Sequence, residues 1–234
     1  MNRVVFDIET MAVPPESLQE EQREYLFRFA DTEQKRTEAL QQMNLSPFTA
    51  RIIAIAMLNP DTGGGKVFYE DPVAEPSASE DGRVEFVPGS ERETLQGFWG
   101  AIERYTQFIT FNGRGFDCPF LMLRSAMLKV KPTRNLVPYR YSTAESIDLL
   151  EQLGFYGGFR RFSLDFYCRA FGIQSPKAGG ITGLDLPALH AAGRFREIAE
   201  YCLGDVVATA ELFRIWETHL RFERPAPPKH ESRT

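Results

Sequence analysis

Cysteine and histidine are scarce in this chain, which has only three of each among its 234 residues. The cysteines, Cys118, Cys168 and Cys202, are odd in number and form no Cys-x-x-Cys pair. Neither a disulfide framework nor a thiolate zinc site is therefore indicated, and we expect the three thiols to be reduced core residues.

Long apolar runs are also missing, because no stretch approaches the ~20 residues that a membrane-spanning helix needs. The N-terminal residues lead at once into a strand-like segment and lack the regions of a secretory signal. We therefore expect a cytoplasmic protein without a membrane partner. The net charge of −5 argues against a protein that coats nucleic acid by bulk positive charge.

The composition that remains is that of a globular protein, with 43% hydrophobic and 25% charged residues. The length suits one well-buried domain, which we place at residues 1–222. Residues 223–234 hold three prolines among polar residues and are expected to be a disordered tail.

The hydrophobic patterns predict strands first, and then strands alternating with helices. Residues 16–43 are rich in Glu, Gln, Arg and Lys, which predicts a helical-hairpin insertion that bends near Ala30 and restarts with Asp31 as its cap. Strands are expected at 3–8, 51–58, 66–69, 83–87 and 108–111, and helices near 90–105, from 116, and at 145–153, 163–171 and 195–220. This order favours an α/β fold with a mixed sheet flanked by helices.

Two carboxylates, Asp7 and Glu9, end the first strand-like segment. On an extended chain, residues i and i+2 point to the same face, so both can reach one cation while Ile8 enters the opposite layer. Taken alone, the pair fits a solvated strand end better than a metal site.

Two further segments supply acids. Asp117 follows a short strand and a glycine turn, where it can reach the rim of the sheet or simply begin a helix. Tyr201 and Asp205 lie one helical turn apart on one face, although a half-buried tyrosine and a surface acid explain them as well.

Taken together, the segments FDIET, FNGRGFDCPFL and YCLGDVVATAELF resemble the motifs of the DEDD (DnaQ-like) 3′-5′ exonuclease superfamily, in the same order. The likeness is to the tyrosine-type branch and to the proofreading exonuclease domains of family-B DNA polymerases. A histidine-type member would carry histidine five residues before the last aspartate, where this chain has Glu200.

The resemblance implies a ribonuclease H-like fold and two divalent metal ions, for which oxygen ligands favour Mg²⁺ or Mn²⁺. It implies that Asp7 bridges both ions, that Glu9 and Asp205 complete one site, and that Asp117 holds the other. Tyr201 would orient the attacking water, and the products would be 5′-mononucleotides released from the 3′ end.

Substrate contacts are expected from residues beside these motifs and from a basic, aromatic stretch, although ordinary surface and core roles explain the latter equally well. The expected residues are Thr10, Met11, Asn112, Arg114, Phe116, Arg160, Arg161 and Lys177. We expect single-stranded DNA as the substrate, with RNA left open. The alternatives are a proofreading subunit that serves a separate polymerase and a non-catalytic nucleic-acid-binding module, and the protein partners considered are a polymerase or repair proteins.

Overall fold

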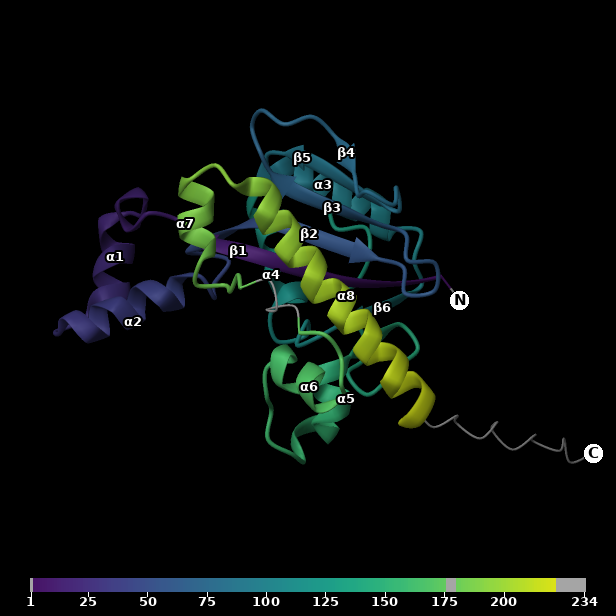
Figure 1. Ribbon diagram of the computed structural model, residues 1–234. Coiled ribbons are helices and arrows are strands. Elements are labelled where there is room, and N and C mark those ends of the chain that lie inside the picture. Colours follow the sequence, from purple (N-terminus) through teal and green to yellow (C-terminus); the bar gives the residue numbers. More distant parts are fainter. Residues whose placement is uncertain (1, 176–179, 222–234) are drawn as a thin grey trace, which may run out of the picture.

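A computed structural model describes residues 2–175 and 180–221, and its centre is a mixed sheet of seven strands (Figure 1). The strand order is β4-β5-β3-β2-β1-β6-β7. β1 pairs antiparallel with β2 and parallel with β6, so it lies inside the sheet. The strands are β1 (Arg3–Ala12), β2 (Ala50–Leu58), β3 (Gly65–Glu70), β4 (Ser77–Ala78), β5 (Val84–Gly89), β6 (Gln107–Thr110) and β7 (Ser146–Asp148).

Helices cover both faces of the sheet, and side chains that alternate along β1 enter two separate cores. Val5 packs in the core that contains residues of α8 (Phe195–His219), the long helix that crosses the face seen in Figure 1. Phe6 packs in the other core, where its ring lies 5.5 Å from that of Phe98 in α3 (Glu91–Ile102). The remaining helices outside the insertion are α4 (Asp117–Met127), α5 (Leu149–Leu153), α6 (Leu164–Ala170) and α7 (Leu186–Ala191), with short 3-10 turns at Pro15–Ser17 and Phe155–Gly157. This is the expected α/β, ribonuclease H-like arrangement.

The predicted helical insertion is present as α1 (Glu20–Phe27) and α2 (Glu33–Met43), which project from the body of the domain (Figure 1). Every residue of α1 is at least partly exposed, and Met43 is the buried residue of α2. The predicted cap was wrong by one position. Thr32, not Asp31, accepts the hydrogen bond from the amide of Lys35, while Asp31 forms an ion pair with the Lys35 ammonium group at 2.7 Å.

Local patterns located most elements correctly, but the two-residue strand β4 was not expected and two further elements differ. The helix expected at 145–153 begins only at Leu149, because Ser146–Asp148 pairs parallel with β6 as β7. Helix α7 was not anticipated, since its six residues are too few for a periodic pattern.

The three cysteines are buried and free, as expected. None of the described helices is long and apolar enough to cross a membrane. The expected tail, residues 223–234, lies outside the described residues.

Candidate active site

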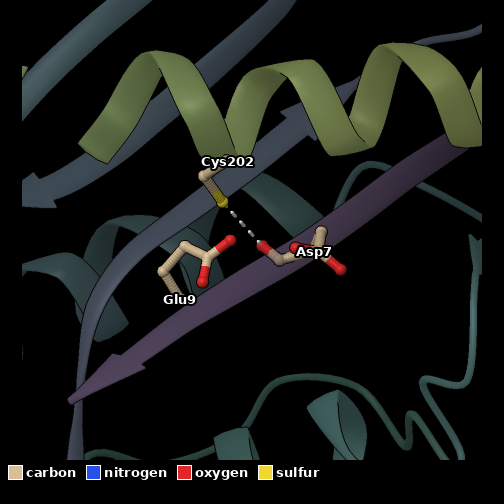
Figure 2. Close-up of side chains that lie close together, drawn as sticks. All are labelled: Asp7, Glu9 and Cys202. Carbon is tan, nitrogen blue, oxygen red and sulfur yellow. Dashed lines mark hydrogen bonds between the residues drawn. The ribbon is translucent and has the colours of Figure 1, made fainter. Parts of the chain in front are cut away.

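The two acids of β1 lie beneath α8. Because Val5 packs in the core containing α8 residues and strand side chains alternate, Asp7 and Glu9 face the same helix, whereas Ile8 is buried on the opposite side. Figure 2 shows both carboxylates on β1 with Cys202 of α8 directed toward them. Single ligand atoms of Asp7, Glu9 and Cys202 lie within 4.8 Å of one another.

The chain between β6 and α4 brings Asp117 to the same place. Strand β6 runs parallel to β1 and pairs with it only as far as Val5, so the loop that follows β6 turns back beside Asp7. Asp117 is the first residue of α4 and is buried. Its Oδ1 accepts a 3.1 Å hydrogen bond from the amide of Ile8, which fixes it against the backbone between the two acids of β1.

Helix α8 contributes Tyr201, Cys202 and Asp205. After burial, the charge of Asp205 is the largest influence on the pKa of Glu9, and it raises that pKa. Burial and the charge of Asp205 likewise raise the pKa of Tyr201 above its usual value. The five residues predicted as catalytic, Asp7, Glu9, Asp117, Tyr201 and Asp205, are therefore brought together from three elements.

The acids of this cluster resist ionisation. Burial, followed by the charges of Asp117, Asp205 and Glu9, raises the pKa of Asp7 well above its usual value. Burial raises the pKa of Asp117 to about 7, although its hydrogen bonds with backbone amides, including that of Ile8, act in the opposite direction. Several carboxylates packed together in this way must either hold protons or be neutralised by a cation.

Cys202 is a member of the cluster that we expected only as a core residue. Its thiol donates a 3.6 Å hydrogen bond to the backbone carbonyl oxygen of Asp7, drawn as the dashed line in Figure 2. Burial, followed by the charge of Asp7, raises the pKa of this thiol well above its usual value. The sulfur is thus engaged with the backbone of Asp7, and the other two ligand atoms of this group are carboxylate oxygens.

Asp148, to which we assigned no role, organises the loop that carries Asp117. It ends β7, and its carboxylate accepts hydrogen bonds from the amides of Asn112 (2.9 Å) and Arg114 (3.0 Å). It also caps α5 through the amide of Leu150 at 3.0 Å. The sequence feature that could have indicated this role is an acid at the carboxyl end of a strand. We did not recognise it because residues 145–153 were predicted to form a helix.

Residues of the same loop that we expected to contact substrate have structural partners. Asn112 has a φ of 64°, a left-handed conformation that asparagine tolerates better than most residues. The ring of Phe116 lies 5.3 Å from that of Phe120. The guanidinium of Arg114 donates to the carbonyl of Pro138 at 2.6 Å and lies 3.7 Å from the carboxylate of Glu151.

The other expected contact residues that the structure describes lie on β1 directly after Glu9 and in the segment that precedes α6. The Thr10 hydroxyl donates to the carbonyl of Asn44 at 2.9 Å, and Met11 lines an apolar cavity of about 560 Å³ between α2 and α7. Arg160 lies over the ring of Phe162 at 5.2 Å, and Arg161 is exposed. Lys177 lies outside the described residues.

The fold and the acid cluster together define an α/β domain of the ribonuclease H-like class. A family model described as "Predicted 3'-5' exonuclease related to the exonuclease domain of PolB" matches residues 45–223, which is more than half of the chain. The chain belongs to this family, which indicates 3′-5′ exonuclease activity on nucleic acid. Asp117, Tyr201 and Asp205 fall within the matched range, whereas Asp7 and Glu9 precede it. The comparison with curated proteins gave no match.

Proposed function

We propose that this protein is a metal-dependent 3′-5′ exonuclease of the tyrosine-type DEDD branch, and that Asp7, Glu9, Asp117 and Asp205 form its metal-binding site. One observation carries the proposal: Asp7 and Glu9 of β1 have ligand atoms within 4.8 Å of each other, and, after burial, the charges of Asp117 from α4 and Asp205 from α8 raise the pKa of both. Repulsion between the carboxylates of such a cluster destabilises the fold when no cation is bound. Divalent cations relieve this repulsion, and the cluster therefore favours their binding.

The chemistry of the donors fits two hard cations. Carboxylate oxygens are the ligands that Mg²⁺ and Mn²⁺ prefer. Asp7, whose pKa responds to all three other acids, is suited to bridge both ions. We assign Glu9 and Asp205 to the ion on the nucleophile side and Asp117 to the second. When bound, such a pair lowers the pKa of the attacking water and stabilises the attacking and leaving oxygens.

Tyr201 is the residue we assign to orienting the water. Its raised pKa keeps the phenol protonated at neutral pH, so its hydroxyl can hold a water by a hydrogen bond without adding negative charge. It lies one helical turn from Asp205 and therefore shares its face of α8. In-line attack at phosphorus, with release of the 3′-terminal nucleotide, gives a 5′-mononucleotide as the product.

Single-stranded DNA is our proposed substrate, with RNA the alternative that the same assay tests. Thr10, Met11, Asn112 and Phe116 are proposed to contact the terminal nucleotides, since they flank the acids in sequence. Arg114 is engaged with Glu151 and Pro138, so its substrate role would require it to leave these partners. A polymerase or repair protein as a partner stays a prediction.

The deciding experiment follows 5′-labelled and 3′-labelled oligomers of single-stranded DNA and RNA in Mg²⁺, Mn²⁺ or EDTA. The 3′ label should appear at once as a mononucleotide, and the 5′ label should shorten stepwise, only with metal present. Asp7→Asn should abolish both signals, whereas Asp81→Asn, in an exposed turn, should retain them. Oligomer binding without cleavage in either metal would instead identify a non-catalytic binding module.

A further inference from the structure

Two chain segments, residues 139–141 and 155–162, form an exposed surface that we call the aromatic–arginine surface. Tyr139, Phe155 and Phe159 are 72%, 61% and 67% exposed. The segments meet where the rings of Tyr141 and Tyr156 lie 5.0 Å apart. Soluble proteins rarely leave such a group of large rings exposed unless the surface binds something.

The backbone of this surface is held in an uncommon conformation. Phe155 and Tyr156 are consecutive non-glycine residues with φ of 47° and 55°. Left-handed backbone is unfavourable for aromatic residues. Residues held in such strained conformations cluster at active sites and ligand-binding segments, so two successive ones indicate a functional segment. In this conformation Phe155 stays exposed and its ring meets that of Phe159 edge to face at 5.7 Å.

The charge of this surface is opposite to that of the whole chain. The two segments contain three arginines and no acidic residue, although the chain carries a net charge of −5. Arg160 lies over the ring of Phe162, and within the described part of the chain neither Arg160 nor Arg161 has an ion-pair partner. Arg140 pairs with Glu151 at 2.6 Å but remains 45% exposed. Exposed rings combined with unpaired arginines match the bases and phosphates of a single strand.

A series of ring contacts connects this surface to the end of β6. Phe111 directly follows β6, and its ring lies 5.7 Å from that of Tyr167 in α6. The ring of Phe162 lies 6.2 Å from the same tyrosine. Helix α6 packs against α8, the helix that carries Asp205. The surface is therefore continuous, through packed side chains, with the elements that position the acids.

We infer that the aromatic–arginine surface binds the single-stranded nucleotides that lie 5′ to the scissile phosphate. Exposed tyrosine and phenylalanine rings stack on successive bases, while Arg160 and Arg161 contact phosphates. Stacking of this kind tolerates any base, but it requires unpaired ones, so the surface selects single strands over duplexes. This inference rests on the proposed exonuclease function.

The test compares a dinucleotide with a 12-mer of single-stranded DNA as substrates for the full-length protein in Mg²⁺. In the double variant Phe155→Ala/Phe159→Ala, kcat/KM should fall about fivefold or more for the 12-mer, because one lost stacked base is worth at least that factor. Hydrolysis of the dinucleotide should not change. Phe29→Ala, which removes a ring of 73% exposure on the insertion, serves as the matched control and should leave both rates unchanged.

The double variant Arg160→Ala/Arg161→Ala gives an independent measurement. Binding of the 12-mer in EDTA should weaken, and the slope of log Kd against log salt should become smaller by about 1.4, as two lost single-strand phosphate contacts require. Arg83→Ala, also exposed, should leave the slope unchanged.

The outcomes separate the two proposals. If the wild type hydrolyses neither the dinucleotide nor the 12-mer in either metal, the exonuclease function itself is wrong. If the wild type is active and both double variants treat the 12-mer as the wild type does, the function stands and the inferred surface is wrong. In the latter case its exposed rings would be a protein-docking surface instead.

Discussion

The amide of Ile8 donates its hydrogen bond to the side chain of Asp117, at the point where β1 has lost its neighbour β6. The carboxylate thus supplies an acceptor where the ladder between β1 and β6 has ended. Because Ile8 lies between Asp7 and Glu9, this one contact fixes the position of three acids at once. The carboxylate whose Oδ1 completes the sheet in this way also belongs to the proposed metal site.

This arrangement predicts different outcomes for two substitutions of Asp117. Asp117→Asn keeps an oxygen acceptor for the Ile8 amide but removes a charge, so metal-dependent hydrolysis should fall at least about 100-fold while Tm in EDTA stays the same or rises. Asp117→Ala leaves the amide without its partner and should also cost about 1–3 kcal/mol of stability. Thermal unfolding and oligomer hydrolysis measure the two effects. Equal destabilisation by both variants would contradict the role of the hydrogen bond.

The raised pKa values predict how the stability of the metal-free protein depends on pH. In the unfolded chain these carboxyls titrate near pH 4, whereas in the folded protein the pKa of Asp117 is about 7 and those of Asp7 and Glu9 are also raised. The folded state therefore holds more protons, and its stability in EDTA should fall as pH rises from about 4 through about 7, at about 1.4 kcal/mol per pKa unit for each group.

Metal should reverse that trend, because cations replace the protons. Adding Mg²⁺ or Mn²⁺ should raise Tm strongly at pH 8 and little at pH 5, where protons compete for the same oxygens. Thermal unfolding across this pH range, with and without metal, measures the difference. A constant Tm in EDTA between pH 4 and 8 would show that the cluster is not desolvated as described.

Cys202 provides a test of which metals the site takes. Since its thiol is protonated and donates to the carbonyl of Asp7, Cys202→Ser should keep a donor and retain Mg²⁺-dependent activity within about threefold. Cys202→Ala should lose roughly 1 kcal/mol of stability and keep most of the activity. Loss of activity in both variants, with the fold intact, would make the sulfur a ligand and point to a softer metal.

Asp148 should prove necessary for the geometry of the site although it is not proposed to touch metal or substrate. Asp148→Ala leaves the amides of Asn112 and Arg114 unpaired in a partly buried loop, which should cost about 1 kcal/mol for each and lower kcat by displacing Asp117. The matched control is Asp71→Ala, because Asp71 accepts from the amides of Val73 and Ala74 in a surface loop. That variant should change Tm and kcat little.

The sequence predicted the parts of this fold that depend on local pattern. The alternation around Val4, Phe6 and Ile8 located β1, and Ser90 with Glu93 located the start of α3 through a capping box that is present. The acids of the proposed site were predicted because their spacing resembles a known set of motifs.

What the sequence did not predict depends on contacts between distant residues. Ser146–Asp148 is a strand only because β6 lies beside it, and nothing in its own pattern distinguishes it from the helix that follows. The pairing of Arg114 with Glu151 could not be anticipated either, because it depends on how the loop after β6 packs against α5. The place of Cys202 in the cluster could not be anticipated for the same reason, because Cys202 lies on α8 and its neighbours Asp7 and Glu9 lie on β1.

The position of β1 inside the sheet also determines how the protein should respond to partial unfolding. Strand β4 has two residues at the sheet edge, and the insertion contributes little to the core, so both should exchange their amide hydrogens through local opening. The amides of β1 should exchange only when the whole domain unfolds. Heat should therefore abolish catalysis in the same transition that melts the sheet, and no folded but inactive state should accumulate on the way.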